Sequence, residues 1–294
     1  MKGRDKVDVL IYGLSNSAVL MLMAIGFSLT FGLSGVANFA HGGIYIFGGL
    51  LSWIFFRSIG LPYFLASILS IFLMALFALL IYRFFLIRVR GTVLNEVVAT
   101  LAIGIAVLEF FRYMGFITYE YSLPYFVSGN WRIGDVSFSI HRVFILLVAI
   151  LLASFLWYYT HKTKRGLALL GMSQDEYTAL SVGIDSDWSA MWSMALGGAF
   201  AAIAALTIMP LGIISIDQGY DVLLIALAIT VVGGVESTKG LILASLILGY
   251  GQTLTGALLS PHYEKVVYLA AILIILAVKP SGLIGHFKEL EERV

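Results

Sequence analysis

Cysteine is absent from this 294-residue chain, and charged residues are scarce. The absence of cysteine excludes disulfide bonds, thiol catalysis and cysteine-bound metals. Only 12% of the residues are charged and 60% are hydrophobic, whereas a soluble domain carries about 25% charged and about 45–50% apolar residues. So few charges cannot cover a water-facing surface, and lipid must therefore contact much of this chain.

Motifs for catalysis and nucleotide binding are also missing. The nearest candidate for a phosphate-binding loop, Gly233–Gly240, lacks the Gly-Lys-Ser/Thr ending that holds phosphates. The sequence contains no nucleophile elbow and no zinc-binding HExxH motif, and its five histidines lie far apart. We therefore predict that the chain is not an enzyme, has no metal site and carries no cofactor of its own. The formal net charge of +1 implies no nucleic-acid partner.

Long runs without charge dominate what is present. The run Val9–Phe56 could hold two membrane-spanning helices, because one span needs roughly 20 apolar residues. We predict an all-α polytopic membrane protein with about eight or nine transmembrane helices, forming a single transmembrane domain over residues 1–294. All five prolines fall at the ends of predicted spans, where a missing N–H costs least. The predicted spans are Val9–Leu33, Val36–Phe56, Tyr63–Leu86, Leu94–Met114, Val143–Tyr159, Trp188–Met209, Val222–Val235, Gly240–Leu259 and Val266–Val278.

Two pairs of predicted spans are separated only by short glycine-rich breaks, so two segments are predicted to be interrupted. Residues 34–43 read SGVANFAHGG, and residues 233–240 read GGVESTKG. Interrupted helices at matching positions point to a substrate path in transporters. A tight cytoplasmic turn between ordinary helices is the alternative, and the sequence leaves both interpretations open.

Glu109 is the one carboxylate predicted to lie well inside an apolar helix, and Arg112 follows one turn later. A carboxylate within a membrane span indicates function by default. The alternative is a structural ion pair between Glu109 and Arg112 near the outer interface.

The longest polar stretch without a span covers residues 161–187. Within it, Leu167–Val182 is predicted to form one short amphipathic helix that ends at Gly183. Asp185 or Ser186 can cap the next helix. With this loop inside and nine spans, the inner side carries slightly more than half of the Lys and Arg residues, which weakly favours this orientation. Elsewhere, Gly134–Ile140 alternates as a short strand or interfacial segment would.

Gly35–Gly42 reads GVANFAHG, which resembles the Asn-Phe-Ala-His-Gly signature of branched-chain amino-acid ABC permeases of the LivH type. Other segments resemble the same family in the same order, and together they cover nearly the whole chain. These segments are Arg90–Thr92, Gly134–Ile140, Arg165–Gly166, Gly183–Ile184, Gly233–Gly234 with Gly240, and Lys279–Gly285.

The resemblance implies the permease subunit of an ATP-binding-cassette importer in a bacterial or archaeal inner membrane. Such a subunit moves a small polar nutrient, here branched-chain amino acids, by alternating access. The implied partners are a homologous second permease that makes a heterodimer, two cytoplasmic ATPase subunits that bind ATP and Mg²⁺, and an extracytoplasmic substrate-binding protein.

The resemblance also implies that residues 161–187 form a cytoplasmic coupling loop with a short helix that docks on the ATPase. The family's Glu-Ala-Ala core aligns with Tyr177-Thr178-Ala179, so the first two positions depart from the pattern. The residues expected to dock are Arg165, Gln174, Asp175, Glu176, Tyr177, Ala179 and Gly183.

Six polar residues are expected along the substrate path, and each also has a structural interpretation. They are Asn38, His41, Glu109, Asp217, Glu236 and Ser237. Asn38 and His41, for example, could instead cap the interrupted helix.

Other functions stay open at this point. The same class of importer could carry urea, amides or other small organic acids. An ion-coupled secondary transporter would need more buried carboxylates than this sequence offers, and a membrane scaffold or sensor would not need the polar loop.

Overall fold

The computed structural model describes residues 3–116, 121–133, 136–212 and 214–285, and helices dominate this part of the chain. Six of the helices described there are long and apolar enough to cross a membrane. They are α1 (Gly3–Phe27, with a π-helical continuation Ser28–Leu33), α3 (Tyr63–Ile81), α5 (Val93–Tyr113), α6 (Ile140–Lys162), α9 (Ser186–Ile208) and α11 (Thr238–Leu258).

Three shorter helices occupy the remaining predicted spans. They are α2 (His41–Trp53), α10 (Gln218–Gly233) and α12 (Glu264–Val278). Each of the nine predicted spans therefore contains a helix, and the prediction of an all-α polytopic fold is confirmed. The small elements are α4 (Ile87–Val89), α7 (Lys164–Gln174), α8 (Glu176–Ser181), β1 (Asn130–Ile133) and β2 (Val136–Ser139). The two strands pair antiparallel, with Asn130 opposite Ser139. Strand β2 falls in the segment for which the sequence predicts a short strand or an interfacial segment.

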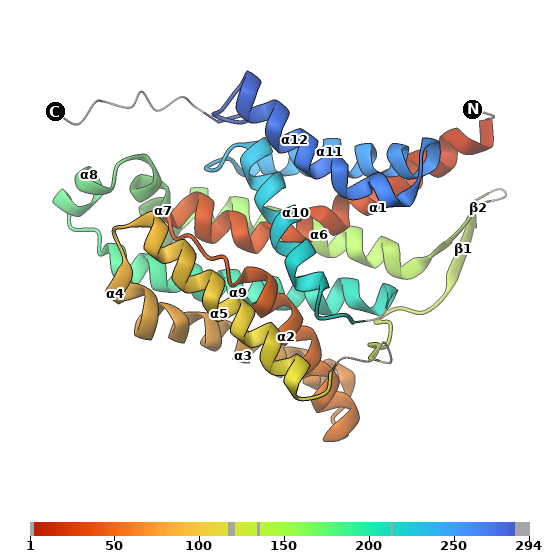
Figure 1. Ribbon diagram of the computed structural model, residues 1–294, viewed down its shortest axis with the longest axis horizontal. Coiled ribbons are helices and arrows are strands. Elements are labelled where there is room, and N and C mark those ends of the chain that lie inside the picture. Colours follow the sequence, from red (N-terminus) through yellow and green to blue (C-terminus); the bar gives the residue numbers. More distant parts are fainter. Residues whose placement is uncertain (1–2, 117–120, 134–135, 213, 286–294) are drawn as a thin grey trace.

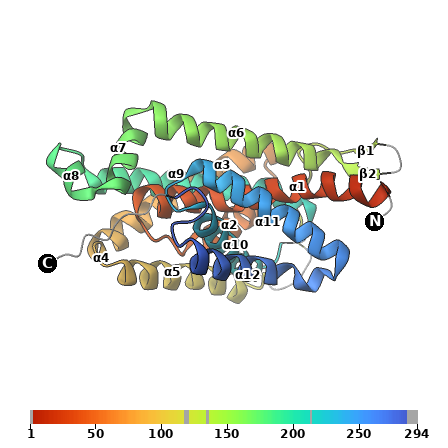
Figure 2. The same ribbon diagram turned by 90° about the horizontal axis from the view of Figure 1, so that it is seen from above.

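Helices α1 and α9 form the centre of the bundle. Figure 2 shows α6 along one side and α5 with α12 along the other, with α1 and α9 between them. Small residues make this central packing possible: a Cβ on Gly26 would lie 2.7 Å from the carbonyl oxygen of Gly197, so only glycines allow this approach.

The bundle has two distinct ends (Figure 1). The hairpin β1–β2 and the start of α1 lie at one end, which we call the hairpin end. The helices α7 and α8 lie at the other end, which we call the loop end.

The first break is an extended segment that runs into the bundle. The backbone N–H of Ala37 donates to Glu96 Oε2 (3.3 Å) and that of Phe39 donates to Thr100 Oγ1 (3.0 Å). Because side chains of α5 satisfy these backbone groups, no helix is needed there. The predicted start at Val36 is therefore wrong: α2 begins at His41, which is completely buried, beside the middle of α5.

The second break is a tight turn, as the alternative interpretation predicts. Helix α10 ends at Gly233, and Ser237 caps α11 by accepting a hydrogen bond from the N–H of Gly240 (3.0 Å). The second break lies beside the π-helical end of α1, because a Cβ on Gly32 would overlap the carbonyl of Val235.

The polar loop also differs from its prediction, since two helices replace the single helix Leu167–Val182. Asp175 leaves the helical conformation and its side chain accepts a hydrogen bond from the N–H of Thr178 (3.1 Å). A carboxylate can replace the missing backbone partners at a helix start, so α8 begins afresh after Asp175. Asp185 caps α9 in the same manner, accepting from Trp188 N–H (2.9 Å), as predicted.

Candidate functional site

A cavity of about 350 Å³ opens near the hairpin end, and we call it the hairpin-end cavity. Its walls come from the first turns of α10 and α12, the last turns of α11 and the segment that follows α9. Small-molecule sites typically enclose about 300–1,000 Å³ and are mostly apolar with a few polar groups. The cavity has this character. Its apolar wall includes Ile208, Met209, Leu211, Val222, Leu224 and Ile225.

Charged and amide side chains line one region of the same cavity. Lys265 Nζ of α12 forms an ion pair with Asp221 Oδ1 of α10, at 2.7 Å. Gln252 Nε2 of α11 donates a hydrogen bond to Glu264 Oε2, also of α12, at 2.6 Å. The start of α12 is therefore tied to two neighbouring helices by polar contacts that face the cavity.

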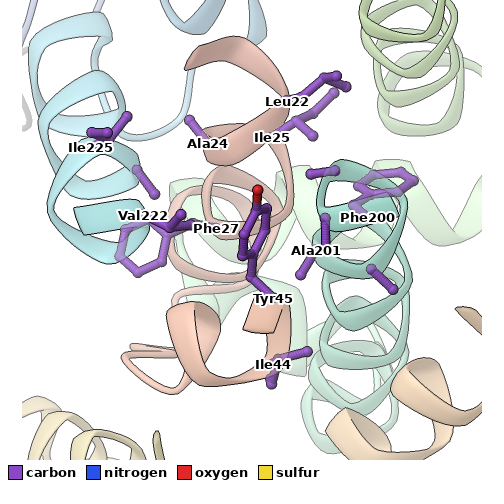
Figure 3. Close-up of a cluster of buried hydrophobic side chains, with 14 of the residues drawn as sticks. Leu22, Ala24, Ile25, Phe27, Ile44, Tyr45, Phe200, Ala201, Val222 and Ile225 are labelled. Carbon is purple, nitrogen blue, oxygen red and sulfur yellow. The ribbon is translucent and has the colours of Figure 1, made fainter. Parts of the chain in front are cut away.

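The floor of the cavity is formed by Met23 of α1 and Tyr45 of α2. Tyr45 is almost completely buried among side chains of α1, α9 and α10, including Ile25, Ala201 and Val222 (Figure 3). The ring of His41 contacts Met23, because its Nε2 is 2.9 Å from the carbonyl oxygen of that residue. The first turn of α2 thus supports the cavity from inside the bundle.

Asn38 and His41 do not cap α2 with their side chains, so that structural interpretation is wrong. The N-terminal cap position of α2 is Ala40, without a side-chain hydrogen bond. Both side chains are fully buried. Neither the amide of Asn38 nor Nδ1 of His41 has a hydrogen-bond partner within the described residues. Two of the six predicted path residues adjoin the cavity lining: Asp217 directly precedes Gln218, and His41 contacts Met23.

Glu109 and Asp217 meet at the hairpin end through Arg112. Arg112 lies 3.4 Å from Glu109 and 2.8 Å from Asp217, and the Glu109 side chain is 49% exposed. The alternative ion pair between Glu109 and Arg112 is present, and Glu109 lies about one turn before the end of α5. The buried carboxylate of α5 is Glu96, 5% exposed, which the sequence marks only as a charge in the first turn.

Glu236 and Ser237 lie in the turn between α10 and α11 at the loop end. Glu236 is exposed and Ser237 caps α11. The six predicted path residues therefore fall into three separate places instead of one site. Their role along a path stays a prediction.

The predicted docking residues are gathered at the loop end, on α7, α8 and the turn after α8. The Arg165 guanidinium lies over the Trp192 ring, 5.0 Å from its centre, and thereby ties α7 to α9. Gly183 has φ +86 and ends α8: its N–H donates to Leu180, and the next N–H, of Ile184, donates to Ala179. This is the C-terminal glycine geometry that the sequence predicts.

The side chains of α8 differ in exposure. Ala179 is buried, whereas Tyr177 is 74% exposed and Val182 is 72% exposed. Gln174 and Asp175, between the two short helices, are also exposed.

Comparison with known proteins identifies the architecture. Residues 9–276 match the family model described as the permease component of the branched-chain amino acid transport system. The chain belongs to this family. The permease is therefore a multi-pass protein of the cell inner membrane and a transport component, and the prediction that it is not itself an enzyme is confirmed.

Similar proteins include two bacterial permeases. LivH of Salmonella typhimurium, named a high-affinity branched-chain amino acid transport system permease, is 25% identical over 93% of this chain and 94% of its own length. BraD of Pseudomonas aeruginosa, with the same description, is 26% identical over 94% and 95%. Among solved structures, PsaBC from Streptococcus pneumoniae in complex with Fab is similar with a TM-score of 0.50, 16% identity and coverage of 93% and 92%. At this identity the last similarity shows the fold alone.

Sequence reasoning missed the residues of the hairpin-end cavity. Asp221 and Glu264 lie in the first turns of two short helices, where acidic residues are common for electrostatic reasons alone. The sequence does mark α10 and α12 as the shortest predicted spans. Nothing in the linear sequence indicates that these two helices begin side by side.

Proposed function

We propose that this permease imports branched-chain amino acids as part of an ATP-driven complex. The observation that carries the proposal is the family match over residues 9–276, which spans both breaks, the cavity and the polar loop. The names of LivH and BraD support the same substrate class. Urea, amides and other small organic acids are less well supported, because no observation on this chain favours them.

The partners are a second homologous permease, two cytoplasmic ATPase subunits and an extracytoplasmic substrate-binding protein. ATP and Mg²⁺ bind to the ATPases and not to this chain. The second permease is a homologue and not an identical copy. In this complex the loop end faces the cytoplasm, and the hairpin end faces the binding protein.

The loop formed by residues 161–187 couples the ATPases to the bundle. The exposed apolar side chains of Tyr177 and Val182 suit a buried contact with another subunit. The cation–π contact of Arg165 with Trp192 connects this surface to α9, at the centre of the bundle. Rigid-body motion of the ATPases can therefore reach the helices around the cavity.

The proposed function is tested by purification of the tagged chain from its native membrane in mild detergent, followed by reconstitution into vesicles. We expect two ATPases and a second permease to co-purify, and ATP-dependent uptake of leucine in the presence of the binding protein. Uptake of urea in place of leucine would change the substrate assignment from branched-chain amino acids to urea. Uptake by this chain alone, driven by an ion gradient, would overturn the importer assignment.

The coupling role has its own test. We expect Gly183→Pro and Glu176→Ala to lower ATP-driven uptake while the chain still assembles in the membrane, because both alter the loop and not the bundle. Lys239→Ala, an exposed change in the neighbouring loop-end turn, serves as the control. Wild-type uptake by Gly183→Pro would remove the coupling assignment.

A further inference from the structure

The hairpin-end cavity combines two surfaces that suit the two parts of an amphipathic ligand. One surface is aliphatic, with Leu211, Val222 and Ile225 among its residues. The other carries two acidic groups and one basic group, Asp221, Glu264 and Lys265, at the starts of α10 and α12. A ligand that fills this space meets both surfaces at once.

The ion pair between Asp221 and Lys265 is open to exchange with a ligand. Its side chains are 39% and 66% exposed, respectively. Water screens pairs of this kind, and they contribute little to stability. A ligand with its own carboxylate and ammonium group can replace each partner of the pair without leaving a buried charge unpaired.

The carboxylate of Glu264 is held in place beside the cavity. Gln252 donates a hydrogen bond to one of its oxygens, Oε2, which fixes the carboxylate at the start of α12. A carboxylate can accept several hydrogen bonds, so Glu264 keeps the capacity to accept one from an ammonium group.

We propose that the hairpin-end cavity binds the zwitterion of an aliphatic amino acid. Lys265 pairs with the carboxylate of the ligand, Asp221 and Glu264 pair with its ammonium group, and the aliphatic wall surrounds its side chain. This inference rests on the proposed function, and it names the residues of this chain that recognise the substrate once the binding protein has released it.

The charges of the lining favour a zwitterion over other small ligands. An anion would face two carboxylates beside one lysine, and a neutral amide would offer no charge in exchange for either partner of the ion pair between Asp221 and Lys265. A simple amine is the competing ligand, because acidic groups outnumber basic ones in the lining. The experiment therefore has to separate an amine from an amino acid.

Gly212 is a suitable position for a cysteine whose chemical labelling reports on ligand binding in the cavity. It lines the cavity, its φ of −153 is accessible to any residue, and a Cβ added there meets no atom within 4 Å. The natural chain has no cysteine, so Gly212→Cys creates a single thiol whose labelling is scored by the mass of this subunit. Tyr263→Cys is the matched control, since Tyr263 is exposed just before α12 and does not line the cavity.

The full importer carrying Gly212→Cys is labelled with a small methanethiosulfonate reagent, with and without leucine. We expect leucine to slow labelling of Gly212→Cys and to leave Tyr263→Cys unchanged. We expect 3-methylbutylamine, which lacks the carboxylate, and 4-methylpentanoate, which lacks the ammonium group, to need at least about tenfold higher concentration. That is the size of effect expected from losing one charge-assisted contact.

Charge variants test which residue binds the carboxylate of the ligand and which binds its ammonium group. In the Gly212→Cys background, Lys265→Gln should weaken protection by leucine but not protection by 3-methylbutylamine, because Lys265 competes with the amine for Asp221. Asp221→Asn should weaken protection by leucine and by the amine. Arg112→Gln breaks two other ion pairs at the hairpin end, with Glu109 and Asp217, and should leave protection by leucine unchanged.

The outcomes separate this inference from the proposed function. If the wild-type importer takes up leucine with ATP but leucine does not protect Gly212→Cys, or the thiol is not labelled at all, the cavity assignment is overturned and the function stands. Equal protection by 3-methylbutylamine and leucine would also overturn it, in favour of an amine site. If the wild-type complex does not take up leucine, the proposed function fails whatever the labelling shows.

Discussion

The side chain of Thr100 forms hydrogen bonds with backbone groups of the first break. Its hydroxyl oxygen accepts from the N–H of Phe39 (3.0 Å) and lies 2.8 Å from the carbonyl oxygen of Ala37. The side chain is fully buried in α5. Without it, backbone groups of the extended segment would lose their partners inside the bundle, where water cannot replace them.

Thr100→Val should therefore destabilise the permease by about 1–3 kcal/mol, the cost of leaving buried polar groups unpaired. Thr207→Val is the control, because the Thr207 hydroxyl is also buried but, within the part of the chain that the structure describes, bonds only to Ile203, one turn earlier in its own helix. Thermal unfolding of the two purified variants in the same detergent compares them. Equal shifts in melting temperature would show that the contacts of Thr100 with the break add no stability beyond that of a hydroxyl bonded within its own helix.

Lys265 presents the opposite case, a charged side chain whose loss should hardly affect folding. Its pair with Asp221 is exposed, so Lys265→Gln should change the free energy of unfolding by less than about 1 kcal/mol. The melting temperature of the purified variant checks this expectation. A large drop would mean that the ion pair holds α12 in place, and changes in ligand protection would then no longer report on recognition alone.

At the scale of whole elements, α2 and α10 approach each other so closely that no side chain fits between their first turns. A Cβ on Gly42 would overlap the carbonyl of Gly219, a backbone group that cannot rotate away. Gly42→Ala should consequently force the two helix starts apart and destabilise the fold by about 1–3 kcal/mol or more.

Gly212→Ala provides the matched comparison, because the same added methyl group meets open space there. The amount of folded protein recovered from the membrane and its melting temperature measure both variants. If Gly42→Ala folds as well as Gly212→Ala, the contact between α2 and α10 is looser than the structure shows.

The short helix α8 can be tested as a docking element. Val182 is 72% exposed at its end, and a buried apolar anchor in an interface typically contributes about 2 kcal/mol or more. Val182→Glu should reduce recovery of the ATPase subunits with the tagged permease by about tenfold or more. Ser181→Glu adds the same charge at the neighbouring exposed position and should have a smaller effect. Similar losses in both variants would indicate charge repulsion and not a lost apolar contact.

At the scale of the whole molecule, the hairpin and the coupling loop lie at opposite ends of the bundle (Figure 1). Asn130 in β1 and Ser181 in α8 are both exposed, and the natural chain has no cysteine. A membrane-impermeant thiol reagent should label Asn130→Cys in intact cells, and Ser181→Cys only after the membrane is opened. The reverse pattern would invert the orientation and place the hairpin-end cavity on the cytoplasmic side.

The sequence by itself determined the membrane class, the nine apolar segments that each contain a helix in the described residues, and the resemblance to the family. It did so because lipid requires long runs without charge and because backbone groups in lipid must be satisfied within a helix. Local chemistry likewise predicted the glycine that ends α8 and the aspartate that caps α9, since both depend on neighbours within a few residues.

Only the tertiary structure decided where the first break runs and where the cavity lies. The extended segment before α2 depends on Glu96 and Thr100, about sixty residues further along the chain. Asp221 and Lys265 meet because α10 and α12 begin side by side. Hydropathy and helix signals describe each segment against solvent or lipid, whereas contacts between distant segments depend on how the helices pack against one another.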